Sequence, residues 1–167
     1  TLIQVREKEA GGRDFLTLAQ QVKQVTDHHN IPLIIDDRVD VALACDAAGV
    51  HVGASDLPVA VCRTLLGPDK IVGATAKTVE AALAAWKDGA NYLGTGAIHP
   101  TSTRVATRLT PVSTLNVICR AVPIPVVAIG GLTADNMNVL SDSPIAGIAV
   151  VSAVMQADDP CAAASLL

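Results

Sequence analysis

Polar side chains that can bind anions lie at the start of the chain. Gln4, Arg6 and Lys8 alternate, so they share one side of an extended segment. Arginine binds phosphate groups through paired hydrogen bonds, and lysine binds them as a point charge. This set therefore indicates an anion site. The alternative is a charged loop that is simply solvated, where such residues are common.

Two aspartates follow the next two apolar runs of the chain. Asp37 comes after residues 32–35, and Asp56 comes after residues 49–52. Two carboxylates, together with water and substrate phosphate oxygens, make a common Mg²⁺ site. We therefore predict that these aspartates hold Mg²⁺. The alternatives are that Asp56 caps the helix that follows it and that Asp37 pairs with Arg38.

Two later loops indicate a second phosphate site. Gly130 and Gly131 end the apolar run at residues 125–129, and glycine lets backbone N–H groups approach an anion closely. The last apolar run, residues 146–151, is followed directly by Ser152. Loops after the last two strands form the usual phosphate site of a (β/α)₈ barrel. The alternative is a tight turn that requires glycine.

Other catalytic motifs are missing from the sequence. It contains no GxSxG, and no cysteine stands beside a base, so a nucleophilic hydrolase is not supported. His99 has no second histidine or cysteine at ligand spacing, which argues against zinc. His51 lies inside an apolar run and is expected to be a hydrogen-bonded core histidine. His28 and His29 are expected to be exposed at the end of a helix.

The elements that position these residues alternate between strand and helix. Seven β-rich runs recur along the chain, at residues 2–5, 32–35, 49–52, 70–73, 91–94, 125–129 and 146–151. Helix-like segments follow several of them, at residues 13–27, 57–66, 79–87 and 134–140, with a last helix beginning at Asp158 or Asp159. Such alternation predicts parallel strands joined by right-handed crossovers.

The number of units is one short of a closed barrel. A (β/α)₈ barrel has eight units and typically at least ~200 residues, whereas this chain has 167 residues. We therefore predict an α/β fold, a (β/α)₈ TIM barrel that lacks its first βα unit, with residues 1–167 as a single domain. Active sites of such barrels lie at the carboxyl ends of the strands, where the polar residues above fall.

The composition excludes several classes of partner. Hydrophobic residues make up 50% of the chain, charged residues 17% and aromatic residues 2%, and the net charge is −4. Without a basic block or aromatic platform, nucleic acid is not an expected partner. No apolar run reaches about 18 residues, so no membrane span is expected. Four scattered cysteines without a CxxC predict reduced thiols and a cytoplasmic location, or a plastid in a photosynthetic eukaryote.

Eight short segments occur in an order and spacing typical of one family. They are QVREK at 4–8, DRVDVALA at 37–44, GVHVG at 49–53, DLP at 56–58, LGP at 66–68, PTST at 100–103, VAIGG at 127–131 and VVSA at 150–153. On these segments the chain resembles the thiamine phosphate synthase (thiamine-phosphate pyrophosphorylase) family over essentially its whole length. That family adopts the (β/α)₈ barrel and begins one βα unit earlier, as the strand count suggests.

The resemblance implies a Mg²⁺-dependent transferase reaction. In the family, 4-amino-2-methyl-5-pyrimidinylmethyl diphosphate and 4-methyl-5-(2-hydroxyethyl)thiazole phosphate give thiamine phosphate and pyrophosphate. The mechanism is dissociative: pyrophosphate leaves, a pyrimidine-methyl cation forms, and the thiazole nitrogen captures it. Such chemistry needs charge stabilisation and alignment more than a strong base.

The resemblance also implies residue roles. Gln4, Arg6, Lys8 and Thr75 would contact the pyrimidine diphosphate, with Asp36 where the family usually has an asparagine that contacts the pyrimidine. Asp37 and Asp56 would hold Mg²⁺. The thiazole phosphate would be contacted by Thr101, Thr103, Gly131, Val151 and Ser152. Arg104 replaces the family's usual lysine and, with Arg6 and Lys8, would stabilise the charge of the reacting phosphates.

Two other functions and two partners remain open. The related thiazole tautomerases share the barrel but lack the diphosphate and metal residues that are present here. A non-catalytic barrel that binds thiazole phosphate is the third alternative. In some organisms the synthase is fused to a kinase of the same pathway, so a fused or neighbouring kinase and a homo-oligomer are possible partners.

Overall fold

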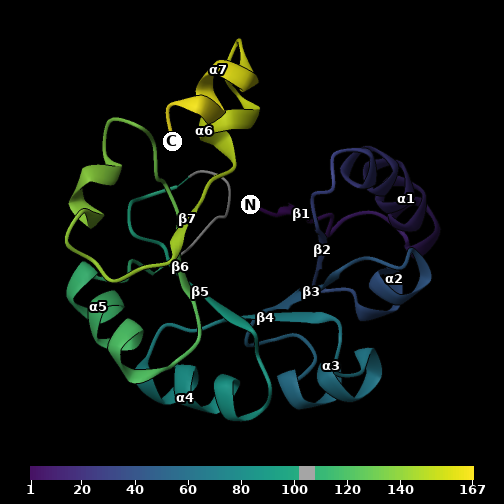
Figure 1. The fold of residues 1–167 in the computed structure, drawn as a ribbon, viewed down its shortest axis with the longest axis horizontal. Helices are drawn as coiled ribbons and strands as arrows, with labels where there is room; N and C mark the ends of the chain where they lie inside the picture. The colour runs from purple at the N-terminus through teal and green to yellow at the C-terminus, as the bar shows by residue number, and fades with distance from the viewer. Residues whose placement is uncertain (102–107) are drawn as a thin grey trace. The chain divides into compact units, whose positions relative to one another are not determined.

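The computed structural model describes residues 1–101 and 108–167, which divide into two compact units. The first unit holds residues 1–75 and 87–91, and the second holds residues 76–86 and 92–167. In each unit, helices cover one face of a sheet of parallel strands (Figure 1). The coarse prediction of an α/β fold with parallel strands is therefore confirmed.

Four strands form the sheet of the first unit, and they lie side by side in chain order. They are β1 (Ile3–Val5), β2 (Leu33–Asp36), β3 (Gly49–Val52) and β4 (Ile71–Thr75). The connecting helices are α1 (Gly12–His28), α2 (Val39–Ala44) and α3 (Val59–Leu66). Because all pairs are parallel, the carboxyl ends of these strands meet at one edge of the sheet.

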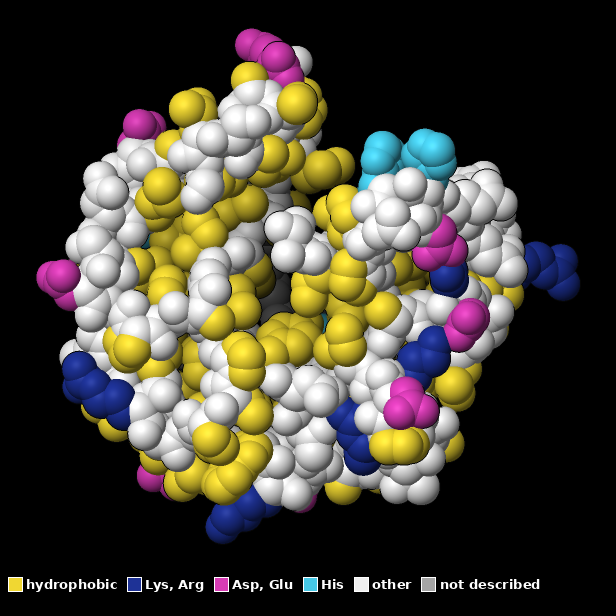
Figure 2. Space-filling view, viewed as in Figure 1, with side chains coloured by type: hydrophobic (Ala, Val, Ile, Leu, Met, Phe, Trp, Pro, Cys, Tyr) yellow, Lys and Arg dark blue, Asp and Glu magenta, His cyan; other side chains and the backbone are white. Residues whose placement is uncertain are grey.

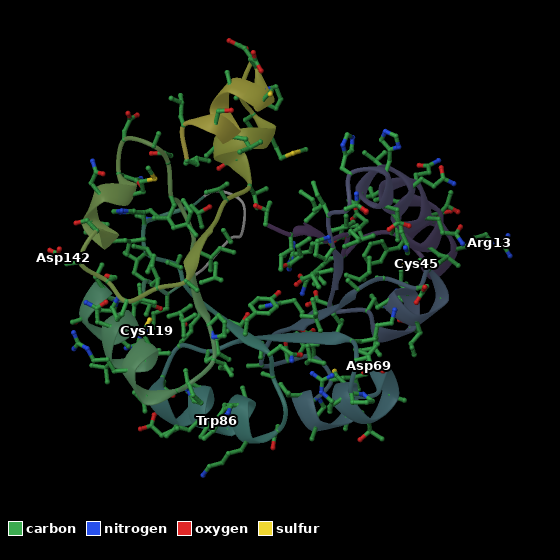
Figure 3. All side chains as sticks on the ribbon, in the orientation of Figure 1. Arg13, Cys45, Asp69, Trp86, Cys119 and Asp142 are labelled. Carbon is green, nitrogen blue, oxygen red and sulfur yellow. The ribbon has the colours of Figure 1, made fainter. Side chains whose placement is uncertain are left out.

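The core of the first unit is aliphatic and closely packed. Every residue of β2 and β3 is buried, and Phe15 of α1 is fully enclosed against them. Cys45, after α2, points inward, whereas Arg13 of α1 points away from the unit (Figure 3). A Cβ on Gly49 would lie 1.9 Å from the carbonyl oxygen of Ile71. The tight contact between β3 and β4 therefore requires glycine at this position.

The second unit has three parallel strands, also in chain order. They are β5 (Tyr92–Gly96), β6 (Val126–Ile129) and β7 (Gly147–Ala149). Its helical segments are α4 (Val79–Lys87, whose last residue falls in the first unit), α5 (Val112–Ala121), the 3₁₀ helix η1 (Met137–Leu140), α6 (Ser152–Met155) and α7 (Pro160–Ser165). Leu93, Leu115 and Ile118 are fully buried and form its core.

All seven predicted strands are present among the described residues, with shifted limits. The runs at 70–73 and 91–94 are strands at Ile71–Thr75 and Tyr92–Gly96. Thr75 therefore ends β4 instead of following it. The last strand is shorter than its apolar run, because the chain turns after Ala149 and α6 begins at Ser152.

Two predicted helices differ from the structure. Residues 134–140 form only the short η1, because the Asn136 side chain holds a turn: its Oδ1 accepts from the Thr133 N–H at 2.9 Å and its Nδ2 donates to the Gly131 carbonyl at 2.9 Å. The helix predicted from residue 57 begins at Val59, after Pro58. The last helix is confirmed, and Asp159 caps it.

One face of the surface shows how the charged side chains are distributed. Lys and Arg side chains are scattered singly over the face in Figure 2, where exposed histidines stand together near the end of α1. His28 and His29 are both exposed, as predicted. Among the described helices, none has the length and apolar character that a membrane crossing requires.

Candidate active site

The cations after β1 meet the aspartates at the end of β2. Gln4 Nε2 donates to Asp36 Oδ1, and Arg6 Nε lies 3.1 Å from Asp36 Oδ2. Lys8 Nζ lies 2.8 Å from Asp37 Oδ2. The predicted sharing of one side is therefore confirmed, because the three alternating residues contact two successive carboxylates. Neither Arg6 nor Lys8 is a freely solvated charge.

The turn after β2 directs the side chains of Asp36 and Asp37 to different partners. Asp36 is the last residue of β2 and is 7% exposed. Asp37 has a φ of 65°, a left-handed conformation that aspartate tolerates better than most residues. The Asp37 N–H donates to the carbonyl of His51 at 2.8 Å, which ties this turn to β3. The backbone thus fixes the position of both carboxylates.

The carboxyl groups of Asp37 and Asp56 interact with each other. Asp56 Oδ2 accepts a hydrogen bond from the Gly53 N–H at 2.8 Å, and its carboxyl hydrogen-bonds with that of Asp37. Burial and this contact raise the pKa of Asp56. Burial also opposes ionisation of Asp37, but hydrogen bonds from Lys8 and Asp56 lower its pKa. The two carboxyl groups therefore influence each other at the ends of adjacent strands.

This pair suits a hard divalent cation. Two neighbouring carboxylates that influence each other's pKa offer oxygen donors, which Mg²⁺ prefers, and Mg²⁺ usually takes its other ligands from water and phosphate. The described residues contain no group of three or more metal-ligating side chains. A metal here would therefore depend on only two carboxylates of the described chain.

The two simpler explanations for the aspartates are wrong. Arg38 pairs with Asp40, with Nε 2.8 Å from Oδ1, and not with Asp37. Asp56 does not cap α3, because no side chain caps that helix and the Asp56 carboxylate turns back to Gly53. The role of Gly53 was not predicted from the sequence, although Gly-x-x-Asp is a spacing at which a side chain can fold back onto the backbone.

His51 and Thr75 form a hydrogen-bonded pair on neighbouring strands. His51 is buried in β3, and its Nε2 lies 3.0 Å from Thr75 Oγ1 at the end of β4. Burial lowers the pKa of His51 to about 4, although the charge of Asp37 raises it. The imidazole is therefore neutral at pH 7. The prediction of a satisfied core histidine is confirmed.

In the second unit, the glycine loop after β6 packs against the segment after β5. Gly130 and Gly131 have φ values of 101° and 63°. A Cβ on Gly131 would lie 2.4 Å from the carbonyl oxygen of Pro100, and the His99 N–H donates to the Gly130 carbonyl at 3.0 Å. The loop therefore needs glycine, and it lies beside the segment that leads to Thr101.

The remaining predicted residues of this unit lie at the carboxyl ends of its strands. Ile129 of β6 pairs with Ala149 of β7, so Gly131 and Val151 leave neighbouring strands at the same edge of the sheet. Ser152 is the first residue of α6. Thr103 and Arg104 lie outside the described residues.

Fold and polar residues together define an α/β protein with a charged site at the carboxyl ends of parallel strands. The family model for thiamine monophosphate synthase matches residues 1–154. The chain belongs to this family.

Individual relatives agree with this assignment. Thiamine-phosphate synthase 2 of Streptococcus pneumoniae is 57% identical over 95% of this chain and 76% of its own length. A bifunctional thiamine biosynthetic enzyme of Arabidopsis thaliana, named as chloroplastic, is 49% identical over 95% of this chain and 31% of its own length. Thiamine phosphate pyrophosphorylase of Pyrococcus furiosus has a similar structure, with a TM-score of 0.91, 41% identity, and coverage of 100% of this chain and 80% of its own.

Proposed function

We propose that this protein is a thiamine phosphate synthase. It transfers the pyrimidine-methyl group of 4-amino-2-methyl-5-pyrimidinylmethyl diphosphate to the nitrogen of 4-methyl-5-(2-hydroxyethyl)thiazole phosphate, and it releases pyrophosphate. The observation that carries the proposal is that Arg6 and Lys8 pair with Asp36 and Asp37 at the end of β2. Family membership and the identity to named synthases support the same reaction.

The first unit binds and activates the diphosphate. Arg6 and Lys8 contact the leaving pyrophosphate and stabilise its charge as the carbon–oxygen bond breaks. Asp37 and Asp56 hold Mg²⁺, which neutralises diphosphate charge when it is bound. Gln4 and Asp36 orient the pyrimidine, and the Thr75 hydroxyl assists at the diphosphate.

The second unit binds the thiazole phosphate. The glycine loop at Gly131 and the segment at Val151 and Ser152 supply backbone N–H groups to the phosphate. Thr101 adds a hydroxyl, as does Thr103, and Arg104 adds a positive charge. The requirement for glycine after β6 supports this assignment, because an added side chain would fill the space next to Pro100.

The complete architecture that fits this function is a (β/α)₈ TIM barrel lacking its first βα unit, with residues 1–167 as one domain. The similarity to the Pyrococcus furiosus structure over the whole chain supports it. The bifunctional plant relative supports a fused or neighbouring enzyme, which we propose is a kinase of the same pathway. We further propose a cytoplasmic location, supported by four free cysteines, and a homo-oligomer.

Pyrophosphate release in the presence of both substrates and Mg²⁺ tests the proposal. We expect release only when both substrates are present, and Asp37→Ala should slow it by at least about 100-fold, because charge stabilisation at the leaving group is lost. Asp142→Ala is the matched control, since Asp142 points into solvent (Figure 3). An unchanged rate in Asp37→Ala would contradict the metal assignment.

The two rival functions give different results in the same assay. Binding of thiazole phosphate without any pyrophosphate release would indicate the non-catalytic barrel. Isomerisation of the thiazole phosphate without pyrophosphate release would indicate a tautomerase.

A further inference from the structure

The negative charge of the chain is concentrated in residues 121–167. This segment contains four acidic residues, Asp135, Asp142, Asp158 and Asp159, and no Lys, Arg or His. The other acidic residues are balanced by the 12 Lys and Arg, which all lie within residues 1–120, so the net charge of −4 arises from this segment. A surface that carries one sign of charge attracts groups of the opposite sign.

A mainly apolar surface groove lies within the same segment of the second unit. It has a volume of about 210 Å³, and it is formed by residues 133–135 before η1, by the start of α6 and by α7. Its apolar walls come from Ala134, Ala153, Ala163 and Leu166. Leu166 is 69% exposed, so apolar surface remains open to solvent along the groove. The three small side chains leave a space that an apolar group of a partner can fill.

Two acidic side chains of this region lack a basic partner. Asp135 lines the groove and is exposed, and Asp158 is exposed two residues before α7. Among the described residues, neither carboxylate forms a salt bridge. Asp159 is different, since its Oδ1 accepts from the N–H groups of Cys161 and Ala162, both at 3.0 Å. On the face in Figure 2, the described side chains over α6 and α7 are mostly hydrophobic, with acidic ones beside them and no Lys or Arg.

The size and exposure of the groove favour a protein segment over a free small molecule. Pockets that enclose drug-sized ligands usually measure about 300–1,000 Å³ and bury most of the ligand. The groove here is smaller, and its lining residues are half-buried or exposed. It therefore has room for one or two apolar side chains of a partner whose remaining surface lies outside.

We propose that this groove is a docking site for a basic amphipathic segment of another protein. Apolar side chains of that segment enter the space beside Ala134, Ala153 and Ala163. Its Lys or Arg side chains lie toward Asp135 and Asp158, whose charge no residue of the same segment neutralises. Amphipathic helices bind apolar grooves in this way, through side chains at i, i+3, i+4 and i+7. The proposed function assigns none of these residues to substrate or metal, so the docking site does not depend on it.

Fluorescence anisotropy with a defined probe peptide tests the proposal. The probe is a labelled synthetic peptide of about 14 residues, with leucine at helical spacing and lysine elsewhere, added to the full chain. We expect saturable binding that weakens at least about fivefold when NaCl rises from about 20 to about 200 mM. A peptide with glutamate in place of lysine, and one with serine in place of leucine, should each bind at least about tenfold more weakly.

Variants of the groove decide whether the peptide binds there. Ala163→Phe fills the groove, and Leu166→Ser removes apolar surface from its wall without adding volume. Each should weaken binding at least about fivefold. Asp135→Asn removes one charge and should weaken binding about threefold, as expected for an exposed ion pair. Thermal denaturation checks that each variant remains folded.

The matched controls come from the same segment. Ala164→Phe adds the same side chain at an exposed position of α7 that does not line the groove, and Asp142→Asn removes the same charge elsewhere. Both should bind the peptide within about twofold of the wild type. Equal losses in the groove variants and in these controls would overturn the proposal, because binding would then depend on net charge alone.

Two other occupants of the groove are separate outcomes. Self-association in analytical ultracentrifugation that Ala163→Phe abolishes would assign the groove to a second copy of the chain. Displacement of the peptide by n-hexylammonium at equal affinity would assign it to a small organic cation. Either result would overturn the assignment to a segment of another protein.

Discussion

Burial favours the neutral forms of two titratable groups near Asp37 and Asp56, which are His51 and Asp36. It lowers the pKa of His51 to about 4, and it raises the pKa of Asp36 to about 7 with help from the charge of Asp37. Arg6 and Lys8 act in the opposite direction on Asp36 without cancelling the effect of burial. Neutral His51 keeps its hydrogen bond with Thr75 over the whole physiological range.

The low pKa of His51 predicts a loss of stability in acid. Between about pH 6.5 and 4 the unfolded chain binds a proton at this histidine and the folded chain does not, so the unfolding free energy falls as the pH falls. The full shift corresponds to about 3 kcal/mol. We expect the difference in unfolding free energy between wild type and His51→Gln to shrink by up to that amount from pH 7 to pH 4, measured by urea denaturation.

The unfolding free energies of the wild type and His51→Gln must be compared as a difference, because Asp36 also titrates in this pH range. Its effect on stability has the opposite sign to that of His51. Its raised pKa means that the folded chain binds the extra proton, so its contribution to stability is lost as the pH rises through about 4 to 7. Both proteins contain Asp36, and its contribution cancels. A difference that stays constant with pH would contradict the neutral, buried state of His51.

At the scale of elements, the sequence predicted the strands but placed the starts of six of the seven one residue too early. The predicted runs begin at Lys70 and Asn91, one residue before β4 and β5. Lys70 instead reaches Asp46 and the Ala47 carbonyl, and Asn91 Oδ1 accepts from the Val72 N–H at 2.8 Å. Such partners are distant in sequence, so local propensity cannot reveal them.

Arg63 joins the ends of several elements of the first unit. From α3 its Nη1 donates to the carbonyls of Gly67 at 2.8 Å and Lys70 at 2.6 Å. Its Nε and Nη2 donate to the Gly89 carbonyl at 3.2 and 2.8 Å, and Nη2 also donates to Asn91 Oδ1. One side chain therefore satisfies acceptors in the loops before β4 and after α4.

Replacing Arg63 should destabilise the fold without touching the site. Arg63→Met keeps the aliphatic length but leaves those acceptors without their donor, so we expect a loss of about 2–4 kcal/mol in unfolding free energy. Arg13→Met is the control, because Arg13 is exposed on α1 and should change stability by less than about 0.5 kcal/mol. Equal midpoints for the two variants in urea denaturation would show that the Arg63 network contributes nothing.

At the scale of the whole molecule, the candidate residues could be predicted more readily than their contacts. Alternation and parallel pairing place Gln4, Arg6 and Lys8 on one side of a strand end. They do not determine which carboxylate each side chain meets, because that depends on the left-handed turn at Asp37. The pairing of Arg6 with Asp36 and of Lys8 with Asp37 therefore emerges only in three dimensions.

The assignment of Asp37 and Asp56 as metal ligands predicts that Mg²⁺ stabilises the folded protein. A ligand that binds only the folded state raises the unfolding free energy by about 2.7 kcal/mol at a concentration 100 times its Kd. For a chain of this size, that is a rise in Tm of about 5–10 °C. We expect this rise when MgCl₂ and pyrophosphate replace EDTA in thermal denaturation, with the ionic strength held constant.

The variants and the pH dependence make this prediction specific to Asp37 and Asp56. Asp37→Asn should abolish the rise in Tm, whereas Asp142→Asn should retain it, because Asp142 is exposed in the second unit. The response should be larger at pH 8 than at pH 5, since burial raises the pKa of Asp56 and Mg²⁺ binds the ionised carboxylate. A rise in Tm of equal size in the wild type and in Asp37→Asn would place the metal elsewhere, because the Asp37 carboxylate would then not be one of its ligands.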